Sequence, residues 1–392
     1  MADDWTAWGP LAERYSVPGP RRILALDGGG IRGVITLGVL AKLERQLREW
    51  RDDPQYRLCQ FFDLIGGTST GAIIATGLAS GMSVEKIAGF YEQFSSVAFK
   101  RRPLWQKWRA LYGDGGLTTT LKTTFGADTT LRPEHLRCLL TVVTRNATTD
   151  SAWPISSNPA AKYNDRARPD CNLNIPLWKL VRASTAAPVF FPPEVVSWDP
   201  DDPAKSFVFV DGGTTAYNNP AFLLFRMATQ PAYRLGWETG EKRLLVVSVG
   251  TGSAPVLGDS AEDSSTNLVE AALNTLSALM SQAAVDQDVN CRVIGRCSYG
   301  GIIDRELHDL VPVDPQVPDT PLRLDVDTGK AFLYVRYNAE LTEAGLKELR
   351  LKGLDPQRLR KMDDIDNISD LKRVGTALGE RVTLDHLGSF AS

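Results

Sequence analysis

Hydrophobic and polar positions along this chain follow two alternating patterns, short apolar runs and longer stretches with helical periodicity. Runs of the first kind occur at 22–26, 61–65, 139–143, 207–210, 244–249 and 332–337. Short runs of apolar, β-branched and aromatic residues predict buried strands. Between the first two runs, Leu40, Leu43, Leu47 and Trp50 recur at spacings of three and four, which predicts an amphipathic helix. Strands that alternate with helices predict an α/β fold with a mostly parallel sheet covered on both faces.

The same pattern divides the chain of 392 residues into three parts. Residues 1–20 contain three prolines and no strong period, so they are interpreted as an N-terminal arm. Residues 21–255 form the α/β core, within which 95–135 has no clear strand and is interpreted as an insertion over one end of the sheet. Residues 256–392 are expected to form a C-terminal extension of helices and a strand, packed on the core.

Composition and charge narrow the classes of function. Hydrophobic residues make up 43% of the chain and charged residues 23%, with a net charge of −3, so nothing indicates a nucleic acid polymer as partner. Five widely spaced cysteines without a C-x-x-C pair suit a reducing compartment, and no leader or membrane-spanning run is evident. The three histidines stand in no zinc motif, so no metal and no cofactor is expected. These features predict a cytoplasmic protein.

Candidate chemistry begins at Ser69, in the sequence Gly67-Thr68-Ser69-Thr70-Gly71. It follows an apolar run and precedes a helix-prone stretch that ends near Gly81. Small residues around a serine permit the strained strand-to-helix turn called a nucleophile elbow. In this turn the serine hydroxyl projects from the edge of the sheet, and the positive end of the following helix points toward it. We therefore interpret Ser69 as a candidate nucleophile.

Two Asp-Gly-Gly clusters strengthen this interpretation because they also follow predicted strands. Asp27-Gly28-Gly29-Gly30 comes after the run at 22–26, and Asp211-Gly212-Gly213 comes after the run at 207–210. In α/β sheets the active site lies at the carboxyl ends of the strands. If the strands are parallel, both clusters and the serine meet at one edge of the sheet.

A serine hydroxyl needs a base and donors for the oxyanion that forms on attack. No histidine lies beside a glycine motif, so Asp211 is the expected general base, with burial raising its pKa. The alternative is that Asp211 only caps the turn that follows it. Closely spaced N–H groups of Gly28, Gly29 and Gly30 are expected to form the oxyanion hole. Arg32 could add charge stabilisation there or hold the loop through a salt bridge.

The first glycine cluster also fits a dinucleotide fingerprint. Gly28-x-Gly30-x-x-Gly33 lies between a predicted strand and a helix, and Glu49 follows about 20 residues on. However, Glu49 falls within the helical period rather than at the end of a second strand, where a ribose would bind. Nucleotide binding at this loop would also leave the serine motif and Asp211 unexplained.

Four blocks of the sequence, in this order, resemble those characteristic of patatin-like phospholipases. They are Asp27–Gly33, Gly67–Gly71, Ala183–Pro192, and Asp211–Gly213 with Asn218–Pro220. The resemblance covers about residues 20 to 255. It implies a three-layer α/β/α acyl hydrolase with a Ser-Asp dyad that acts on glycerophospholipids or related esters without a catalytic metal. It also implies that Ser69 is the nucleophile, Asp211 its proton acceptor and the Gly28 to Gly30 loop the oxyanion hole.

Two of these blocks also have a structural interpretation. The prolines of 188–192 are typical of a rigid apolar turn that supports the site, which we favour over direct substrate contact. Asn218 and Asn219 are expected to hydrogen-bond the loop that carries Asp211.

Other functions of such a fold stay open. The resemblance extends to bacterial enzymes that cyclic nucleotides activate in phage defence, so a small-molecule activator is one alternative, and a binding protein without turnover is another. Segment 94–109 mixes aromatic and basic residues, which suits transient contact with the inner membrane surface and its phospholipids. The same segment could instead form a lid or a core helix. The sequence does not indicate an oligomeric state.

Overall fold

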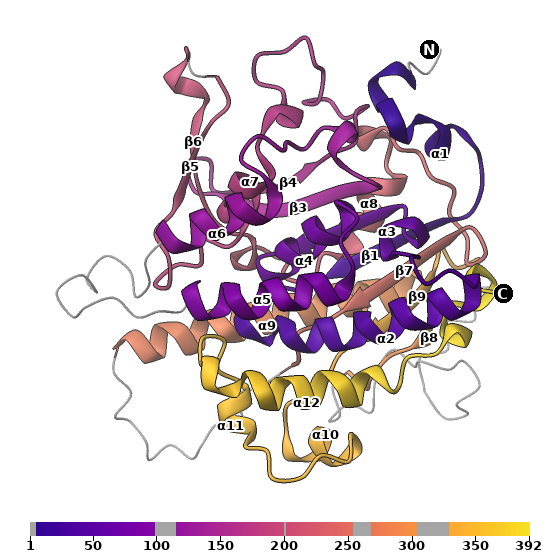
Figure 1. Cartoon of the computed structure of the whole chain (residues 1–392), viewed down its shortest axis with the longest axis vertical. Coiled ribbons are helices and arrows are strands. Elements are labelled where there is room, and N and C mark those ends of the chain that lie inside the picture. Colours follow the sequence, from indigo (N-terminus) through magenta and orange to yellow (C-terminus); the bar gives the residue numbers. More distant parts are fainter. Residues whose placement is uncertain (1–4, 99–114, 200, 254–267, 304–328) are drawn as a thin grey trace.

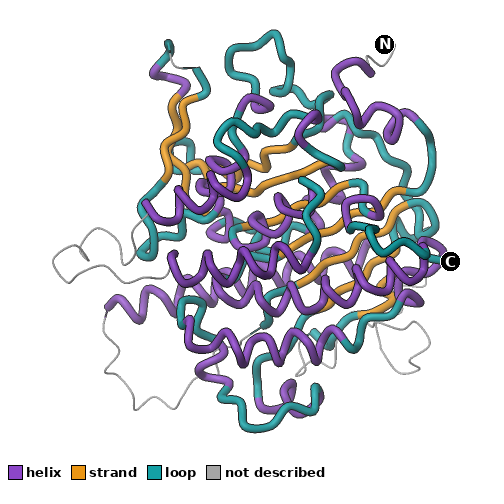
Figure 2. Tube along the Cα trace, in the orientation of Figure 1, coloured by secondary structure: helices purple, strands orange, loops and turns teal. Residues whose placement is uncertain are grey.

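The computed structural model describes residues 5–98, 115–199, 201–253, 268–303 and 329–392 (Figure 1). These residues build one mixed sheet with helices on both sides, as Figure 2 shows by secondary structure. The order of neighbouring strands is β5-β6-β3-β2-β1-β7-β9-β8, and β4 also pairs with β3. The three-layer α/β/α fold expected from the sequence is confirmed.

The strands fall into a parallel group and an antiparallel group. The parallel group consists of β1 (Arg21–Leu26), β2 (Leu64–Thr68), β3 (Leu139–Asn146), β7 (Leu244–Val249), β8 (Arg296–Tyr299) and β9 (Leu333–Tyr337). The antiparallel group consists of β4 (Ser151–Ser156), β5 (Glu194–Ser197) and β6 (Ser206–Asp211). In the parallel group, Leu26 at the end of β1 aligns with Gly67 and with Val249, so the carboxyl ends of these strands share one edge.

The helices differ widely in length. They are α1 (Ala12–Ser16), α2 (Gly33–Arg51), α3 (Leu58–Phe61), α4 (Thr70–Ala79), α5 (Val84–Ala98), α6 (Gly115–Phe125), α7 (Leu177–Ser184), α8 (Ala221–Thr229), α9 (Leu268–Ile294), α10 (Glu343–Glu348), α11 (Pro356–Leu359) and α12 (Ile368–Gly379). None of the helices in the described ranges has the length and apolar character needed to cross a membrane.

Alternate residues of β1 contribute to two separate cores, because successive side chains of a strand point to opposite faces. Leu24 and Leu26 pack with α2, α4 and α12 on one face. Ile23 and Ala25 pack with α8 on the other, where Tyr15 of the N-terminal segment also lies. The sheet is therefore buried on both faces, which explains why its central strands are continuous apolar runs.

Close packing of α12 on α2 brings the C-terminal part of the chain to the core, and the two helices lie side by side in Figure 1. A Cβ on Gly38 would lie 2.4 Å from the backbone of Gly375. The backbones of α2 and α12 can therefore come this close because each helix has a glycine at the contact. Before α12, the carbonyl of Met362 accepts a hydrogen bond of 2.9 Å from the Ile31 N–H. The C-terminal segment therefore touches the glycine loop after β1.

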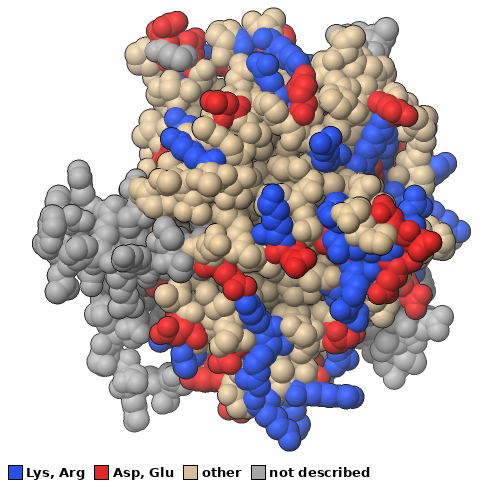
Figure 3. Space-filling view, in the orientation of Figure 1, with Lys and Arg blue, Asp and Glu red and all other residues tan. Residues whose placement is uncertain are grey.

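The predicted strands at 22–26, 139–143, 207–210 and 244–249 are confirmed as β1, β3, β6 and β7. The strand expected at 61–65 is shifted to β2, since residues before it form α3. The side chains of segment 94–109 lie outside the described part of the chain. Acidic and basic side chains are mixed over the face viewed in Figure 3, which fits the small net charge.

Candidate active site

Ser69 occupies a strained turn between β2 and α4. Its φ of 53° lies in the left-handed region, which costs energy for a residue with a side chain. Both flanking positions have no room for a side chain. A Cβ on Gly67 would lie 2.1 Å from the carbonyl oxygen of Gly71, and a Cβ on Gly71 would lie 2.2 Å from the carbonyl oxygen of Leu26. The predicted elbow is therefore confirmed as a local structure, with Ser69 at the N-terminus of α4.

A second serine holds this turn in place. The backbone N–H of Ser69 donates to Ser184 Oγ at 2.9 Å, and Ser184 Oγ donates to the carbonyl of Val143 at 2.6 Å. Ser184 is fully buried at the end of α7. It thereby ties the elbow to the neighbouring strand β3.

Asp211 lies directly beside the serine hydroxyl. Ser69 Oγ donates to Asp211 Oδ2 at 2.5 Å, and the other carboxylate oxygen accepts from the Gly213 N–H at 2.7 Å. Burial raises the pKa of Asp211 to about 6, although these two hydrogen bonds and Arg182 lower it. A carboxylate with this pKa is a better base than an exposed one, yet is mostly ionised at neutral pH.

The route by which Asp211 reaches the site differs from the expectation that the strands run parallel. Its strand, β6, is antiparallel to β3 and overlaps only the last residues of β3, so that Asp211 pairs with Thr144. Because β6 enters from outside and stops at this point, its end still meets the carboxyl edge of the parallel strands. The expected meeting of Ser69 and Asp211 is therefore correct, while the assumed strand direction is wrong.

The glycine loop between β1 and α2 lies next to the serine turn, since a Cβ on Gly28 would lie 3.3 Å from the Cβ of Ser69. The Gly28 N–H is already bound to the carbonyl of Asn218 at 3.1 Å. Within the described ranges, the N–H groups of Gly29 and Gly30 have no hydrogen-bond partner. The carbonyl of Gly30 is held by Thr70 Oγ1 at 2.8 Å and by the Tyr91 hydroxyl. These two bonds fix the peptide that follows Gly30.

Arg32 is buried behind this loop and does not line the cavity at Ser69. Its Nε donates to the carbonyl of Gly29 at 3.4 Å, which is a contact within the loop. Burial lowers the pKa of Arg32 to about 10, while the charge of Asp27 opposes that shift. This geometry favours the alternative in which Arg32 holds the loop, through a hydrogen bond rather than the expected salt bridge.

A mostly apolar cavity opens over Ser69 and Asp211. Besides these two, its walls are Gly30, Thr70, Ile73, Thr185, Ala187, Pro188, Phe190, Phe191, Thr214, Met280 and Met362. The turn at 188–192, expected to be a support, also forms part of the wall. Sequence reasoning missed Met280 and Met362, because both come from the C-terminal part and carry no motif.

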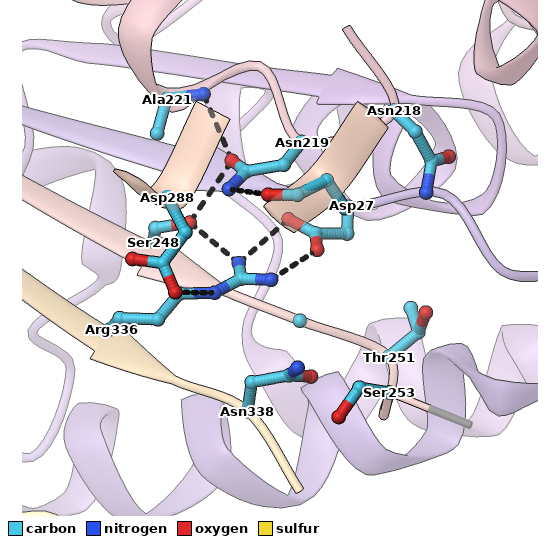
Figure 4. Close-up of polar contacts among 12 residues, drawn as sticks. Asp27, Asn218, Asn219, Ala221, Ser248, Thr251, Ser253, Asp288, Arg336 and Asn338 are labelled. Carbon is cyan, nitrogen blue, oxygen red and sulfur yellow. Dashed lines mark hydrogen bonds and ion pairs between the residues drawn. The ribbon is translucent and has the colours of Figure 1, made fainter. Parts of the chain in front are cut away.

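The two asparagines after Asp211 bind elsewhere than expected. Asn218 binds the glycine loop through its carbonyl. Asn219 Oδ1 accepts from the Ala221 N–H at 3.0 Å and from Ser248 Oγ at 3.1 Å (Figure 4). They therefore connect the segment after Asp211 to the glycine loop and to β7.

The fold and this site define the chain as an α/β/α protein with a serine and an aspartate paired at the carboxyl edge of its sheet. It belongs to the patatin-like phospholipase family, whose model matches residues 24–225, just over half of the chain. The family indicated by the four sequence blocks is thus confirmed.

Relatives of this chain come from bacteria and plants. It is 29% identical to the cGAMP-activated phospholipase of Escherichia coli (strain TW11681), over 62% of this chain and 65% of that protein. It is 32% identical to the cGAMP-activated phospholipase of Vibrio cholerae, over 52% and 56% respectively. It is also 32% identical to Patatin-like protein 4 of Arabidopsis thaliana, over 59% of each. The chain spans less than two thirds of the length of each of these relatives.

Proposed function

We propose that this protein hydrolyses fatty-acyl esters of glycerophospholipids, with Ser69 as the nucleophile and Asp211 as its proton acceptor. The observation that carries the proposal is the 2.5 Å hydrogen bond from Ser69 Oγ to Asp211 Oδ2, at the base of an apolar cavity. Family membership agrees with an ester hydrolase.

The proposed reaction has two halves. Ser69 Oγ attacks the ester carbonyl carbon while Asp211 accepts the hydroxyl proton, and the tetrahedral intermediate collapses when Asp211 returns this proton to the departing alcohol oxygen. Water then attacks the acyl-serine, with Asp211 again taking a proton and passing it to Ser69 Oγ. The products are a free fatty acid and a lysophospholipid, and no metal or cofactor takes part.

The negative oxygen of the intermediate needs donors that are free before the reaction. The N–H groups of Gly29 and Gly30 are suited to this role, because the structure gives them no other partner among the described residues. In this proposal Gly28 anchors the loop through Asn218, and Arg32 holds the Gly29 carbonyl, so both act on the oxyanion hole indirectly.

Substrate preference follows from the cavity wall. Phe190, Phe191 and Ile73 offer apolar contact for an acyl chain, while cationic side chains that would bind a free phosphate are absent from the described wall residues. We therefore place the acyl chain in the cavity and the phospholipid headgroup outside it.

The proposal is tested with Ser69→Ala and Asp211→Asn against two matched exposed controls, Ser197→Ala and Asp150→Asn. Each protein is incubated with a mixed phospholipid extract, and the products are identified by mass spectrometry. We expect fatty acid and lysophospholipid from the wild type and both controls, and a loss of at least about 10³-fold in both site variants. Undiminished hydrolysis by Ser69→Ala and Asp211→Asn would reject the proposal.

A second candidate function is a phospholipase that a cyclic dinucleotide activates. It is supported by the two bacterial relatives, each named as a cGAMP-activated phospholipase. The test compares phospholipid hydrolysis and melting temperature with and without cGAMP, with cyclic AMP as the control ligand. Activation by cGAMP alone supports it, and equal hydrolysis under all three conditions argues for a constitutive enzyme. Absence of hydrolysis and of fluorophosphonate labelling at Ser69 would instead support a binding protein without turnover.

We also propose that the protein works in the cytoplasm and contacts the inner membrane surface transiently. None of the five cysteines forms a disulfide bond and all five are buried, as expected in a reducing compartment. The proposed contact is segment 94–109, and its test is sedimentation with anionic liposomes. Trp105→Ala with Trp108→Ala should weaken liposome binding, and unchanged binding would discard this contact.

A further inference from the structure

A buried ionic network centred on Arg336 adjoins the glycine loop through Asp27, and Figure 4 shows its contacts. Asp27 is the residue before Gly28, and both of its carboxylate oxygens accept hydrogen bonds from Arg336 of β9. Nη1 donates to Oδ1 at 2.8 Å and Nη2 donates to Oδ2 at 2.6 Å. Each residue is 3% exposed. A planar guanidinium bound through two parallel hydrogen bonds fixes the orientation of a carboxylate, which a point charge such as lysine does not.

Arg336 also reaches the other segments that border the loop. Its Nη1 donates to Ser248 Oγ of β7 at 2.7 Å, and the hydroxyl of Ser248 donates to Asn219 Oδ1. The neighbouring Asn218 carbonyl accepts the Gly28 N–H. One guanidinium therefore connects the end of β1, the strand β7 and the segment after Asp211, all at the edge where Ser69 lies.

One face of α9 continues this network. The carbonyls of Met280 and Ala284 accept side-chain N–H groups from the two asparagines, each at 3.4 Å. One turn further, Asp288 Oδ2 lies 3.9 Å from Arg336 Nε, and Asp288 accepts from Arg292 Nε at 3.0 Å. Positions four residues apart share a helix face, so this contact surface is continuous along α9.

The network brings opposite charges together. The carboxylate of Asp27 lies against the guanidinium of Arg336, and the carboxylate of Asp288 lies against that of Arg292. Burial lowers the pKa of Arg336, but the adjacent Asp27 outweighs this and raises it above its ordinary value. A buried ion pair is weak evidence for stability, since apolar replacements are often as stable. Because the Asp27–Arg336 pair lies next to the glycine loop, it is suited to orienting that loop rather than to stabilising the fold.

We propose that Arg336 is a positioning residue for the glycine loop, which through Asp27 fixes the direction of the Gly29 and Gly30 N–H groups. The inference rests on the proposed function, in which these groups bind the oxyanion. It makes the catalytic geometry depend on β9 and α9, which come from the C-terminal part of the chain.

The first test is Arg336→Lys, which keeps the charge and loses the two parallel hydrogen bonds. Its matched control is Arg14→Lys. Arg14 Nε donates to Asp63 Oδ1 at 3.0 Å, just before β2 and therefore at the opposite edge of the sheet. Both variants are assayed with p-nitrophenyl butyrate at a temperature where circular dichroism shows them folded.

We expect Arg336→Lys to lower kcat at least about tenfold with KM within about twofold, because a misdirected donor acts on the transition state alone. Arg14→Lys should keep kcat within about twofold of the wild type. Equal kcat for Arg336→Lys and the wild type, or an equal loss in both variants, would overturn the inference. If Arg336→Lys does not fold, Ser248→Ala removes one partner of Arg336 and should lower kcat severalfold, whereas an unchanged kcat counts against the inference.

The second test does not depend on turnover. Hydrogen exchange of the peptide that spans residues 27–33, followed by mass spectrometry, should be faster in Arg336→Lys than in Arg14→Lys and the wild type. Unchanged exchange would contradict the inference. If the wild type hydrolyses no ester, the proposed function fails, and this comparison still decides whether Arg336 fixes the loop.

Discussion

Replacing Asp211 by Asn is expected to change how the stability of the protein depends on pH. Burial raises the pKa of Asp211 from 3.8 to about 6. The shift is about 2 units, and one unit corresponds to about 1.4 kcal/mol, so the charged form costs the folded state about 3 kcal/mol.

The sign of this effect follows from proton binding. The folded state binds the proton of Asp211 more tightly than the unfolded state does. The stabilisation is therefore fully present below about pH 4 and is lost as the pH rises through 6. Between pH 4 and pH 7 the wild type should lose about 2.5 kcal/mol of stability through this group, and Asp211→Asn should not.

The assay is urea unfolding of both proteins at intervals from pH 4 to pH 8. Other titrating groups cancel in the difference between the two free energies of unfolding, which isolates Asp211. A difference that changes by less than about 0.5 kcal/mol over this range would show that the pKa of Asp211 is not raised in the folded protein. In parallel, wild-type kcat/KM for a soluble ester should rise about tenfold per pH unit below pH 6 and level off above it.

Three further substitutions have defined outcomes. Ser184→Ala removes the hydroxyl that binds the Ser69 N–H. It should lower the free energy of unfolding, measured in urea, by about 1–3 kcal/mol, and a change below about 0.5 kcal/mol would contradict this role of Ser184. Gly38→Ala should lower the melting temperature because its Cβ would meet the α12 backbone, whereas Gly19→Ala, with open space around it, should leave it unchanged. Phe190→Ala should raise KM more for long-chain than for short-chain esters, and an equal rise would argue against an acyl chain at this wall.

The sequence predicts well those features that depend on local pattern. The buried strands β1, β3 and β7 are continuous apolar runs because both of their faces are covered, so their positions are evident from the sequence. The elbow at Ser69 is equally local, since its glycines are required by contacts within the turn and with β1. The edge strands β4 and β5 are missed, because Pro154 and the exposed Val195 weaken the apolar pattern there.

Features that depend on distant segments are not predictable in this way. The direction of β6 is set by its pairing with β3, and the sequence of β6 does not indicate this pairing. Met280 and Met362 reach the cavity through the packing of α9 and of the segment before α12. Arg336 resembles any charged residue in a strand until Asp27, more than 300 positions away, is placed beside it. Each of these contacts joins segments that only the tertiary fold brings together, so the sequence pattern does not predict it.

Locating a covalent adduct on the protein tests directly whether Ser69 is the nucleophile. A fluorophosphonate reacts when a serine Oγ forms a bond to phosphorus and fluoride leaves, and peptide mapping by mass spectrometry finds the modified residue. We expect a single adduct at Ser69 in the wild type, formed at least about 10³ times more slowly in Asp211→Asn. An adduct at another serine, or equal rates of labelling in both proteins, would contradict it.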